Sequence, residues 1–197
     1  MIRYADDTVF CFQYKEDADR FCEALISRLE KFKLEISEEK TKLIKLEKRN
    51  DKDDNNNNSK GGNSFDFLGF THYIGKDRYG KMRVMRKTSK KKYNASLKRC
   101  KEWIRTNRTL PVKEFMKTVN SKIQGHCNYY GVTDNSRSIE NFTDECKKLI
   151  FKWLNRRSQR RSFGWEKFLL FLERYPLPRP RIKVNMFKLG AGGSYLL

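Results

Sequence analysis

The chain has 197 residues, of which 38% are hydrophobic and 35% are charged. Its 44 lysines and arginines outnumber its 24 aspartates and glutamates, so the formal net charge is +20. This length allows one sizeable domain or two small ones with a hydrophobic core. So large a positive surplus predicts a polyanionic partner. No apolar run approaches the ~20 residues that a membrane-spanning helix needs, which excludes a membrane protein and favours nucleic acid as the polyanion.

The cysteines and histidines form no metal-binding or disulfide pattern. The cysteines are odd in number and never paired as Cys-x-x-Cys; they are Cys11, Cys22, Cys100, Cys127 and Cys146. His72 and His126 lie far apart in the sequence. We therefore expect reduced cysteines in the core of an intracellular protein, not a disulfide framework or a zinc site. The N-terminus runs directly into a polar turn without a cleavable signal, so we expect a cytoplasmic location.

The first chemically informative stretch is Tyr4-Ala5-Asp6-Asp7, which leads into the β-branched and aromatic run Thr8 to Phe12. This pattern predicts a tight turn that opens onto a strand, with both carboxylates at a hairpin tip. Adjacent carboxylates repel each other, and Mg²⁺, which prefers hard oxygen ligands, would hold them ionised. Two such metals about 3.5–4 Å apart catalyse phosphoryl transfer in polymerases. The alternative is a solvated turn that only starts a strand.

The segment after this strand predicts a helix followed by polar stretches. Apolar residues at three- and four-residue steps indicate a helix from about Asp17 to Lys33. After the charged turn Ser37-Glu38-Glu39-Lys40, a strand-like pattern extends from Thr41 to Leu46. No apolar residue occurs between Asn50 and Asn63, so we expect a mobile surface insertion at 49–63.

An aromatic stretch, Phe65-Asp66-Phe67-Leu68-Gly69-Phe70, follows this insertion. Its apolar residues alternate as far as Leu68, and Gly69 would allow another backbone to approach closely. We expect this stretch to be one strand of a hairpin. Its partner strand would be Lys81 to Arg86, joined to it through Gly75 to Gly80.

Positive charge is most concentrated between Lys81 and Arg105, which contain eleven lysines or arginines and the single acid Glu102. An apolar stripe from Tyr93 to Ile104 predicts a helix that starts near Ser89 and carries these charges on its outside. A phosphate backbone could lie along the helix, and the alternative is a merely solvated face. The candidate RNA-binding residues here are Lys87, Lys90, Lys91, Lys92, Lys98, Arg99 and Lys101.

Two further helices and a second basic cluster follow. Pro111 suits the first turn of a helix that ends near Gly131, and another helix begins at about Ser138. Short helices joined by short loops predict a small antiparallel bundle. No acid occurs between Phe151 and Trp165, and the planar guanidinium groups in this interval suit phosphates and bases. The candidates there are Arg156, Arg157, Arg160 and Arg161.

Four motifs in this order resemble a known family. They are Tyr4-Ala5-Asp6-Asp7, Leu34-Glu35-Ile36-Ser37-Glu38-Glu39-Lys40-Thr41-Lys42, Phe65-Asp66-Phe67-Leu68-Gly69-Phe70 and Ile123-Gln124-Gly125-His126-Cys127-Asn128-Tyr129-Tyr130-Gly131. The first three resemble the last palm blocks of group II intron reverse transcriptases, also called maturases. The fourth looks like the "GWxNYY" signature of their thumb, with His126 where tryptophan is usual, and this replacement puts the packing of that corner in question. We expect Tyr129 and Tyr130 to be structural and not base-stacking.

The resemblance, which covers roughly Met1 to Phe187, implies an α+β fold. A partial reverse-transcriptase palm, made of β-hairpins and a helix, would span residues 1–86, including the insertion at 49–63. An all-α thumb or maturase-specific bundle would span 87–187, and 188–197 would be a disordered tail.

The resemblance also implies roles for individual residues. Asp6 and Asp7 would be catalytic and would bind Mg²⁺ in a completed active site. Lys40 would lie near the incoming nucleotide, where it could protonate the leaving pyrophosphate or neutralise its charge. Phe67, Leu68 and Gly69 would form the primer grip, which supports the 3′ end of the primer.

The family's palm carries a further carboxylate well upstream of the motif at Tyr4, and only Met1-Ile2-Arg3 precedes that motif here. Asp17, Asp19 and Asp66 are the nearest substitutes, and none is well placed. The resemblance thus implies a C-terminal fragment that binds intron RNA and a DNA primer or target and is not a polymerase alone. An upstream reverse-transcriptase half is a further candidate partner. The alternatives are a stand-alone RNA-binding splicing module and an inactive mobile-element remnant.

Overall fold

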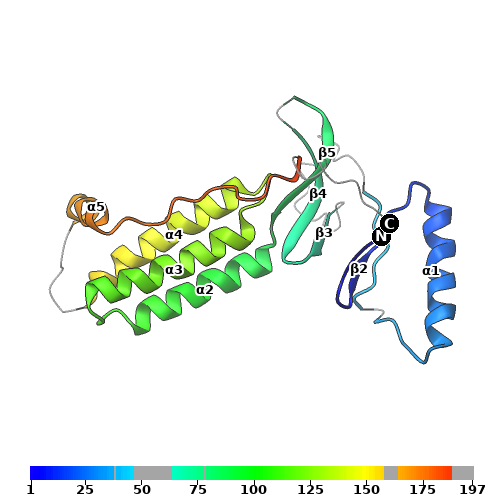
Figure 1. Ribbon diagram of the computed structural model, residues 1–197, viewed down its shortest axis with the longest axis horizontal. Coiled ribbons are helices and arrows are strands. Elements are labelled where there is room, and N and C mark those ends of the chain that lie inside the picture. The colour runs from blue at the N-terminus through cyan, green and yellow to red at the C-terminus, as the bar shows by residue number, and fades with distance from the viewer. Residues whose placement is uncertain (38, 47–63, 78, 158–163, 188–197) are drawn as a thin grey trace, which may run out of the picture. The chain divides into compact units, whose positions relative to one another are not determined.

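The computed structural model of the protein describes residues 1–37, 39–46, 64–77, 79–157 and 164–187. The chain divides into two compact units, 1–67 and 68–197 (Figure 1). The insertion expected at 49–63 and the tail expected at 188–197 lie outside the described residues. The mixture of five helices with small antiparallel sheets in the described part confirms the predicted α+β class.

The first unit begins with the predicted hairpin. Strand β1 (Ile2–Tyr4) pairs antiparallel with β2 (Asp7–Val9), and Tyr4 lies opposite Asp7. Helix α1 (Lys15–Glu30) follows and places Phe21 against Phe10, with 4.5 Å between ring centroids. The helix ends in a Schellman motif: Lys33 has a left-handed φ of 57°, and the Leu34 N–H donates to the Leu29 carbonyl at 3.1 Å.

The expected strand from Thr41 to Leu46 is wrong, because these residues are irregular. Leu43 and Ile44, which gave the pattern its strand-like character, are exposed. An alternating apolar pattern forms a strand only where packing and a neighbouring strand stabilise it. Strand β3 (Ser64–Phe67) is the next regular element of the described chain.

Among its described residues, the first unit has almost no core. Ala18 is the one residue of this part that is buried, whereas Ile2, Tyr4, Phe32 and Leu34 are more than half exposed. A lone two-stranded hairpin is at best marginally stable in water. The described part of the first unit therefore buries too little apolar surface to account for its own stability.

The second unit opens with a long hairpin. Strand β4 (Phe70–Lys76) pairs antiparallel with β5 (Met82–Thr88), in register from Phe70 opposite Thr88 to Lys76 opposite Met82, and the strand order of the sheet follows the chain, β3-β4-β5. The predicted single strand from Phe65 to Phe70 is wrong, since a turn at Leu68 and Gly69 separates β3 from β4. Both turn residues have positive φ, 49° and 82°, as in the tight turns that join hairpin strands. As a result β5 pairs with β4.

Three helices then form the predicted antiparallel bundle, α2 (Lys90–Thr106), α3 (Val112–Tyr130) and α4 (Ser136–Leu154), which lie side by side in Figure 1. The N-cap of α2 is Ser89, whose Oγ accepts the Lys92 N–H, and this confirms the expected helix start. Helix α5 (Trp165–Arg174) adds Phe168 to the core. The largest fully buried side chains include Ile104, Phe115, Ile123, Ile139 and Phe168.

The cysteines of the second unit are buried, whereas those of the first unit are not. Cys100, Cys127 and Cys146 are buried in the bundle as expected, and the Cys100 and Cys146 sulfurs lie 3.3 Å apart as free thiols. The expectation is wrong for Cys11, which is exposed, and for Cys22, which is half-buried, because the described part of their unit has so small a core.

The segment after α5 returns along the bundle toward the β4–β5 hairpin (Figure 1). The side chain of Asn120 donates to the Pro176 carbonyl at 2.8 Å, and the Gly131 carbonyl accepts the N–H groups of Lys183 and Val184. A Cβ at residue 131 would lie 2.7 Å from the Arg181 carbonyl oxygen. Gly131 therefore ends α3 as predicted, and a side chain at this position would collide both with the Cys127 carbonyl oxygen of α3 and with the returning segment. No helix in the described residues is long and apolar enough to cross a membrane.

Candidate nucleic-acid interface

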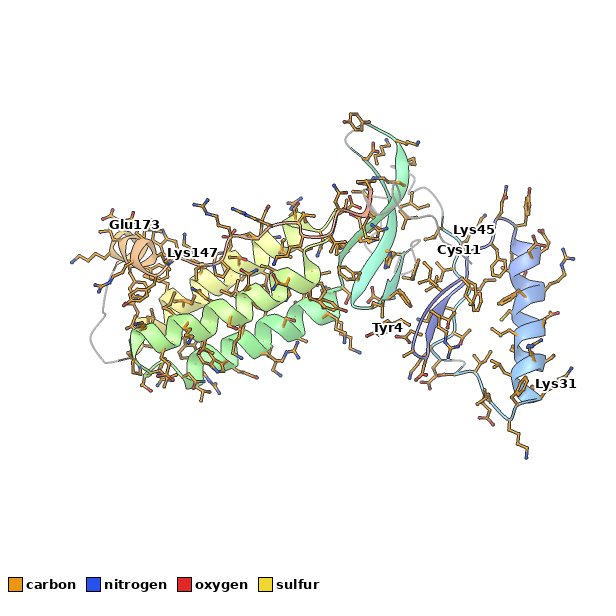
Figure 2. All side chains as sticks on the ribbon, viewed as in Figure 1. Tyr4, Cys11, Lys31, Lys45, Lys147 and Glu173 are labelled. Carbon is orange, nitrogen blue, oxygen red and sulfur yellow. The ribbon has the colours of Figure 1, made fainter. Side chains whose placement is uncertain are left out.

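The two predicted catalytic carboxylates lie on the turn between β1 and β2. Asp6 is in the turn and Asp7 is the first residue of β2, and both are exposed. Ala5 has a positive φ of 49° and its carbonyl accepts a hydrogen bond from Arg3 Nε at 2.9 Å. Tyr4, labelled in Figure 2, ends β1 just before the turn. The local sequence thus places both carboxylates at a hairpin tip, as predicted.

Carboxylate oxygens are suitable ligands for Mg²⁺, but this turn offers only part of a two-metal site. Within the described residues, no group of three or more His, Cys, Asp or Glu side chains is placed to hold a metal ion. Asp17, a possible substitute for a third carboxylate, pairs with Arg20 at 3.2 Å. Asp6 and Asp7 are thus the carboxylates of this turn that would hold a divalent cation.

Lys40 and the predicted primer-grip residues occupy turns. The Lys40 side chain is exposed, and its backbone N–H donates to the Ser37 carbonyl at 3.1 Å. Phe67 ends β3, and Leu68 and Gly69 form the turn that follows. The Leu68 carbonyl accepts the Tyr129 hydroxyl at 3.0 Å, and the Gly69 carbonyl accepts the Ser89 N–H at 2.9 Å. The turn at 68–69 is therefore hydrogen-bonded to both α2 and α3 of the bundle.

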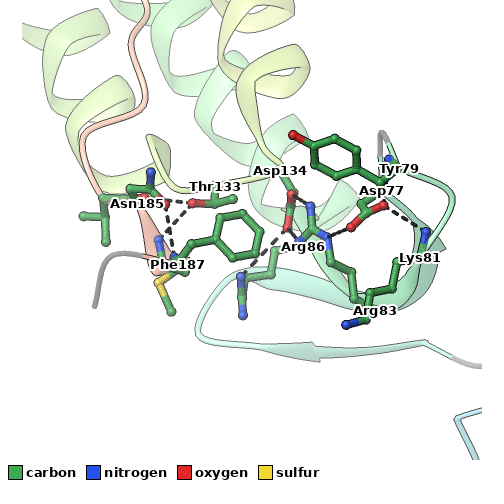
Figure 3. A network of polar contacts seen from close by, with 11 residues as sticks. Asp77, Tyr79, Lys81, Arg83, Arg86, Thr133, Asp134, Asn185 and Phe187 are labelled. Carbon is green, nitrogen blue, oxygen red and sulfur yellow. Dashed lines mark hydrogen bonds and ion pairs between the residues drawn. The ribbon is translucent and has the colours of Figure 1, made fainter. Parts of the chain in front are cut away.

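A charged network that the sequence did not predict ties the β4–β5 hairpin to the bundle (Figure 3). The carboxylate of Asp134 accepts two hydrogen bonds from the guanidinium of Arg83, one of 2.8 Å, and lies 3.9 Å from Arg86. Asp77 lies 3.9 Å from Arg83 on its other side. The hydrogen bond to Asp134 raises the pKa of Arg83 above its ordinary value. Arg83 also lies over the ring of Phe187, 4.8 Å from its centroid, so the returning segment joins the network.

Asn135 is the buried centre of the same junction, and its side chain makes three hydrogen bonds. It accepts the Thr88 backbone N–H at 2.8 Å and donates to the Thr88 hydroxyl at 2.9 Å and to the Tyr130 carbonyl at 2.8 Å. These bonds connect the end of β5, the end of α3 and the start of α4. Asn135 is 0% exposed. Sequence reasoning missed it because its partner Thr88 lies 47 residues away in the chain.

The predicted RNA-binding side chains of α2 and its approach are all exposed. They do not form one continuous row: Arg99 lines the side of α2 toward α3, whereas Lys98 and Lys101 line the side toward α4. Lys87 lies at the end of β5, with its ammonium 5.1 Å from the centroid of Tyr73. Lysine and arginine thus project from both exposed sides of a helix whose apolar residues are packed in the core.

The second basic cluster is only partly described. Arg156 is exposed and lies over Trp153, 5.4 Å from the ring centroid. Arg157 is half-buried, and its guanidinium donates to the Leu110 carbonyl. Arg157 therefore has a structural contact, whatever else it binds. Arg160 and Arg161 lie outside the described residues.

His126, which stands where the family usually has tryptophan, packs as an aromatic residue. It is buried and stacks on Phe142, with 3.6 Å between ring centroids and 16° between ring planes. Burial, together with the nearby charge of Arg99, lowers the pKa of His126 to about 4. The imidazole is thus neutral at pH 7, and a flat neutral ring fills the corner whose packing was in question.

An acidic turn at the start of the chain and a basic helical bundle after it characterise a protein that handles nucleic acid. Residues 1–72 match the family described as reverse transcriptase (RNA-dependent DNA polymerase), and residues 93–169 match the group II intron, maturase-specific domain. No curated protein is significantly similar to the chain.

The chain therefore belongs to the group II intron reverse transcriptase/maturase family. The match to the maturase-specific domain covers nearly all of the helical bundle, from Tyr93 in α2 to Leu169 in α5. The match to the reverse transcriptase family includes the turn that carries Asp6 and Asp7. Reverse transcriptases as a family use divalent metal ions, and the maturase domain implies intron RNA as a binding partner.

Proposed function

We propose that this chain is the RNA-binding part of a group II intron-encoded reverse transcriptase, and that it holds intron RNA and a primer-template without being a complete polymerase. The observation that carries this proposal is the basic helical bundle, in which a packed apolar core supports exposed lysines and arginines on α2. Fixed cations on a rigid helix attract a phosphate backbone and release its counterions. We also propose a cytoplasmic location for the chain.

DNA synthesis, in this proposal, requires a further carboxylate from a reverse-transcriptase half outside these 197 residues. Asp6 and Asp7 would then hold Mg²⁺, which would stabilise the charge that develops during phosphoryl transfer. Lys40 would act on the pyrophosphate, and the turn at Phe67, Leu68 and Gly69 would support the DNA primer. The exposed apolar residues of the first unit, among them Ile2 and Tyr4, support such a partner because they are available for packing against another sheet.

A second candidate function is a splicing module that folds intron RNA and never copies it. The observation that favours this function is the asymmetry between the units: the buried core lies in the second unit. In this candidate function, RNA would bind to that unit without a contribution from the hairpin of Asp6 and Asp7. The two candidates differ in whether adding an upstream half restores DNA synthesis.

Structured intron RNA is expected to bind more tightly than an unrelated RNA duplex of equal length, because a maturase must recognise RNA shape as well as charge. Filter binding at one fixed salt concentration measures both affinities. The matched control is the same intron sequence with its stems disrupted by substitution, which keeps length and charge constant. Equal affinity for all three RNAs would reduce the interaction to nonspecific electrostatics and contradict the maturase proposal.

Primer extension on an RNA template with Mg²⁺ should give no incorporation above background with this chain alone, since two carboxylates do not complete a two-metal site. A separately produced fingers-and-palm half should restore incorporation, and Asp7→Asn should abolish it again. Asp144→Asn is the matched control, because this aspartate is exposed on α4 and does not belong to the β1–β2 turn. Incorporation by the chain alone that disappears in Asp6→Ala would show that no partner is needed.

A further inference from the structure

A cleft of about 490 Å³ lies between α2 and α3, on the side of α2 that carries Arg99. This volume is within the range of small-molecule binding sites. Arg99 and Lys122 provide positive charge in the cleft, aromatic rings of α3 and α4 line the rest, and the lining residues include no carboxylate. The cleft therefore suits a ligand that combines a flat ring with an anionic group.

Tyr129 offers the cleft an exposed and well-supported aromatic ring. The ring packs edge-on against Tyr130 at 4.8 Å and lies parallel to Phe70 at 6.1 Å. Its hydroxyl donates to the Leu68 carbonyl. Despite these contacts Tyr129 is 58% exposed. Tyr130, by contrast, is buried and structural, as expected. A ring that is already fixed loses little conformational entropy when another ring stacks on it.

His126 adds an unpaired polar atom to the same cleft. Its side chain is 8% exposed, and Nε2 is buried without a hydrogen-bond partner. A buried polar atom that is left unpaired costs free energy, so such atoms usually have a ligand or a water as partner. Because the imidazole is neutral, Nε2 can either donate or accept one hydrogen bond, depending on the tautomer, and the edge of a base offers both kinds of partner.

Arg99 and Lys122 face the cleft from opposite helices. The Arg99 guanidinium is within 3.4 Å of the Ser96 hydroxyl, and the Lys122 ammonium lies over the Trp103 ring, 5.3 Å from its centroid. Both side chains are exposed. Two cations held by these neighbours on either side of a cleft are suited to a phosphate group.

We propose that this cleft binds one unpaired nucleotide of an RNA strand, with its base stacked on Tyr129, its phosphate between Arg99 and Lys122, and the base edge at His126 Nε2. The inference rests on the RNA binding proposed above and adds the form of RNA that is bound: single-stranded, not helical. Stacking on an aromatic ring needs a base that is free of its own helix, which is how proteins commonly bind single strands.

The surroundings of the cleft favour a nucleotide within a strand over a free nucleotide. Lys92, Ser96 and Arg99 follow one another at helical spacing on α2, so they share one face of the helix. Lys92 lies beside the turn at residues 68–69, since a Cβ on Gly69 would be 3.6 Å from its Cγ. This row of side chains can contact the phosphate of the neighbouring nucleotide in an RNA strand. A free nucleotide has no such neighbour and could not use the contact.

The test is fluorescence anisotropy with a labelled single-stranded RNA of about eight nucleotides, a length within the usual site size. Tyr129→Leu should weaken binding about ten-fold, as expected for the loss of one base stack. Tyr129→Phe should retain the wild-type affinity, because it keeps the ring. Tyr14→Leu, at a tyrosine that is 60% exposed in the first unit, is the matched control and should bind normally. Circular dichroism melting of each variant shows whether the bundle stays folded.

Two further binding measurements distinguish this inference from general RNA binding. Blunt duplex RNA should bind wild type and Tyr129→Leu equally, and a nucleoside monophosphate should compete far less well than the unlabelled strand. An unchanged single-strand affinity in Tyr129→Leu, or an equal loss on duplex, would overturn the inference while leaving the proposed RNA binding intact. Full competition by the monophosphate would show that the cleft binds a free nucleotide and not a nucleotide within a strand, which would also overturn the inference. Failure of wild type to bind any RNA would contradict the proposed function itself.

Discussion

The affinity of the chain for RNA is expected to fall by about 10³–10⁵ between 50 and 200 mM salt, if the basic surface neutralises roughly 6–10 phosphates. The reason is counterion release, whose free energy decreases as the salt concentration rises. Filter binding across a salt series gives the slope of log affinity against log salt. A slope near zero would show that the exposed lysines and arginines of the bundle do not contact phosphate.

Removing positive charge at defined positions of α2 should flatten this slope. Replacing Lys91, Lys98 and Lys101 of α2 with glutamine should reduce it by about one unit for each phosphate that the protein no longer neutralises. Replacing Lys31, Lys33 and Lys42 of the first unit, which are equally exposed, removes the same charge and should leave the slope nearly unchanged. Equal flattening in both triple variants would mean that only net charge matters.

For the arginine cluster, Arg156→Gln is the informative change. Arg156 is exposed, whereas Arg157 donates to the Leu110 carbonyl. Substituting Arg157 would therefore combine an effect on folding with any effect on RNA. A flattened slope in Arg156→Gln would support the second basic cluster as a phosphate contact, and an unchanged slope would assign Arg156 to the solvated surface.

Replacing Asn135 with alanine should lower the free energy of unfolding of the second unit by about 3–5 kcal/mol. The substitution leaves the Thr88 N–H, the Thr88 hydroxyl and the Tyr130 carbonyl without their bonds to this side chain. Each buried polar group that loses its partner costs about 1–3 kcal/mol, and some of these groups will recover a bond to water.

Chemical denaturation followed by tryptophan fluorescence measures this effect. All three tryptophans, Trp103, Trp153 and Trp165, lie in the second unit, so the signal reports the unit that contains Asn135. The matched control is Asn141→Ala, at an exposed asparagine on α4, which should change the stability by less than about 0.5 kcal/mol. A similarly small loss in Asn135→Ala would show that the junction is not held by this side chain.

The helices of the bundle could be predicted from the sequence because their determinants are local. Apolar residues at helical spacing, Ser89 as an N-cap and Pro111 before α3 identified three helices, and their starts agree with the structure to within about two residues. The turn of Asp6 and Asp7 was predictable for the same reason, since a short polar interruption before a β-branched run determines it.

The strands were harder to predict because strand pairing depends on residues that are distant in the sequence. The sequence pattern predicts one strand that includes Leu68 and Gly69, whereas their positive φ values make them a turn and change the partner of β5. The roles of Asp134 and Asn135 could not be predicted from the sequence, because each forms hydrogen bonds with a residue about fifty positions away. The cleft of Tyr129 and His126 also requires two helices to be side by side, which no single stretch of sequence specifies.

The unequal distribution of the core has an evolutionary consequence. Phe115, Ile123 and Phe168 are buried entirely within the second unit, while the described part of the first unit leaves Ile2, Tyr4 and Phe32 exposed. Substitutions at the acidic turn therefore leave that core untouched, so Asp6 and Asp7 can be lost by mutation without loss of the fold of the bundle. Under the RNA binding proposed above, an intron lineage that stops moving between genomic sites would in this way keep a protein that still binds its RNA.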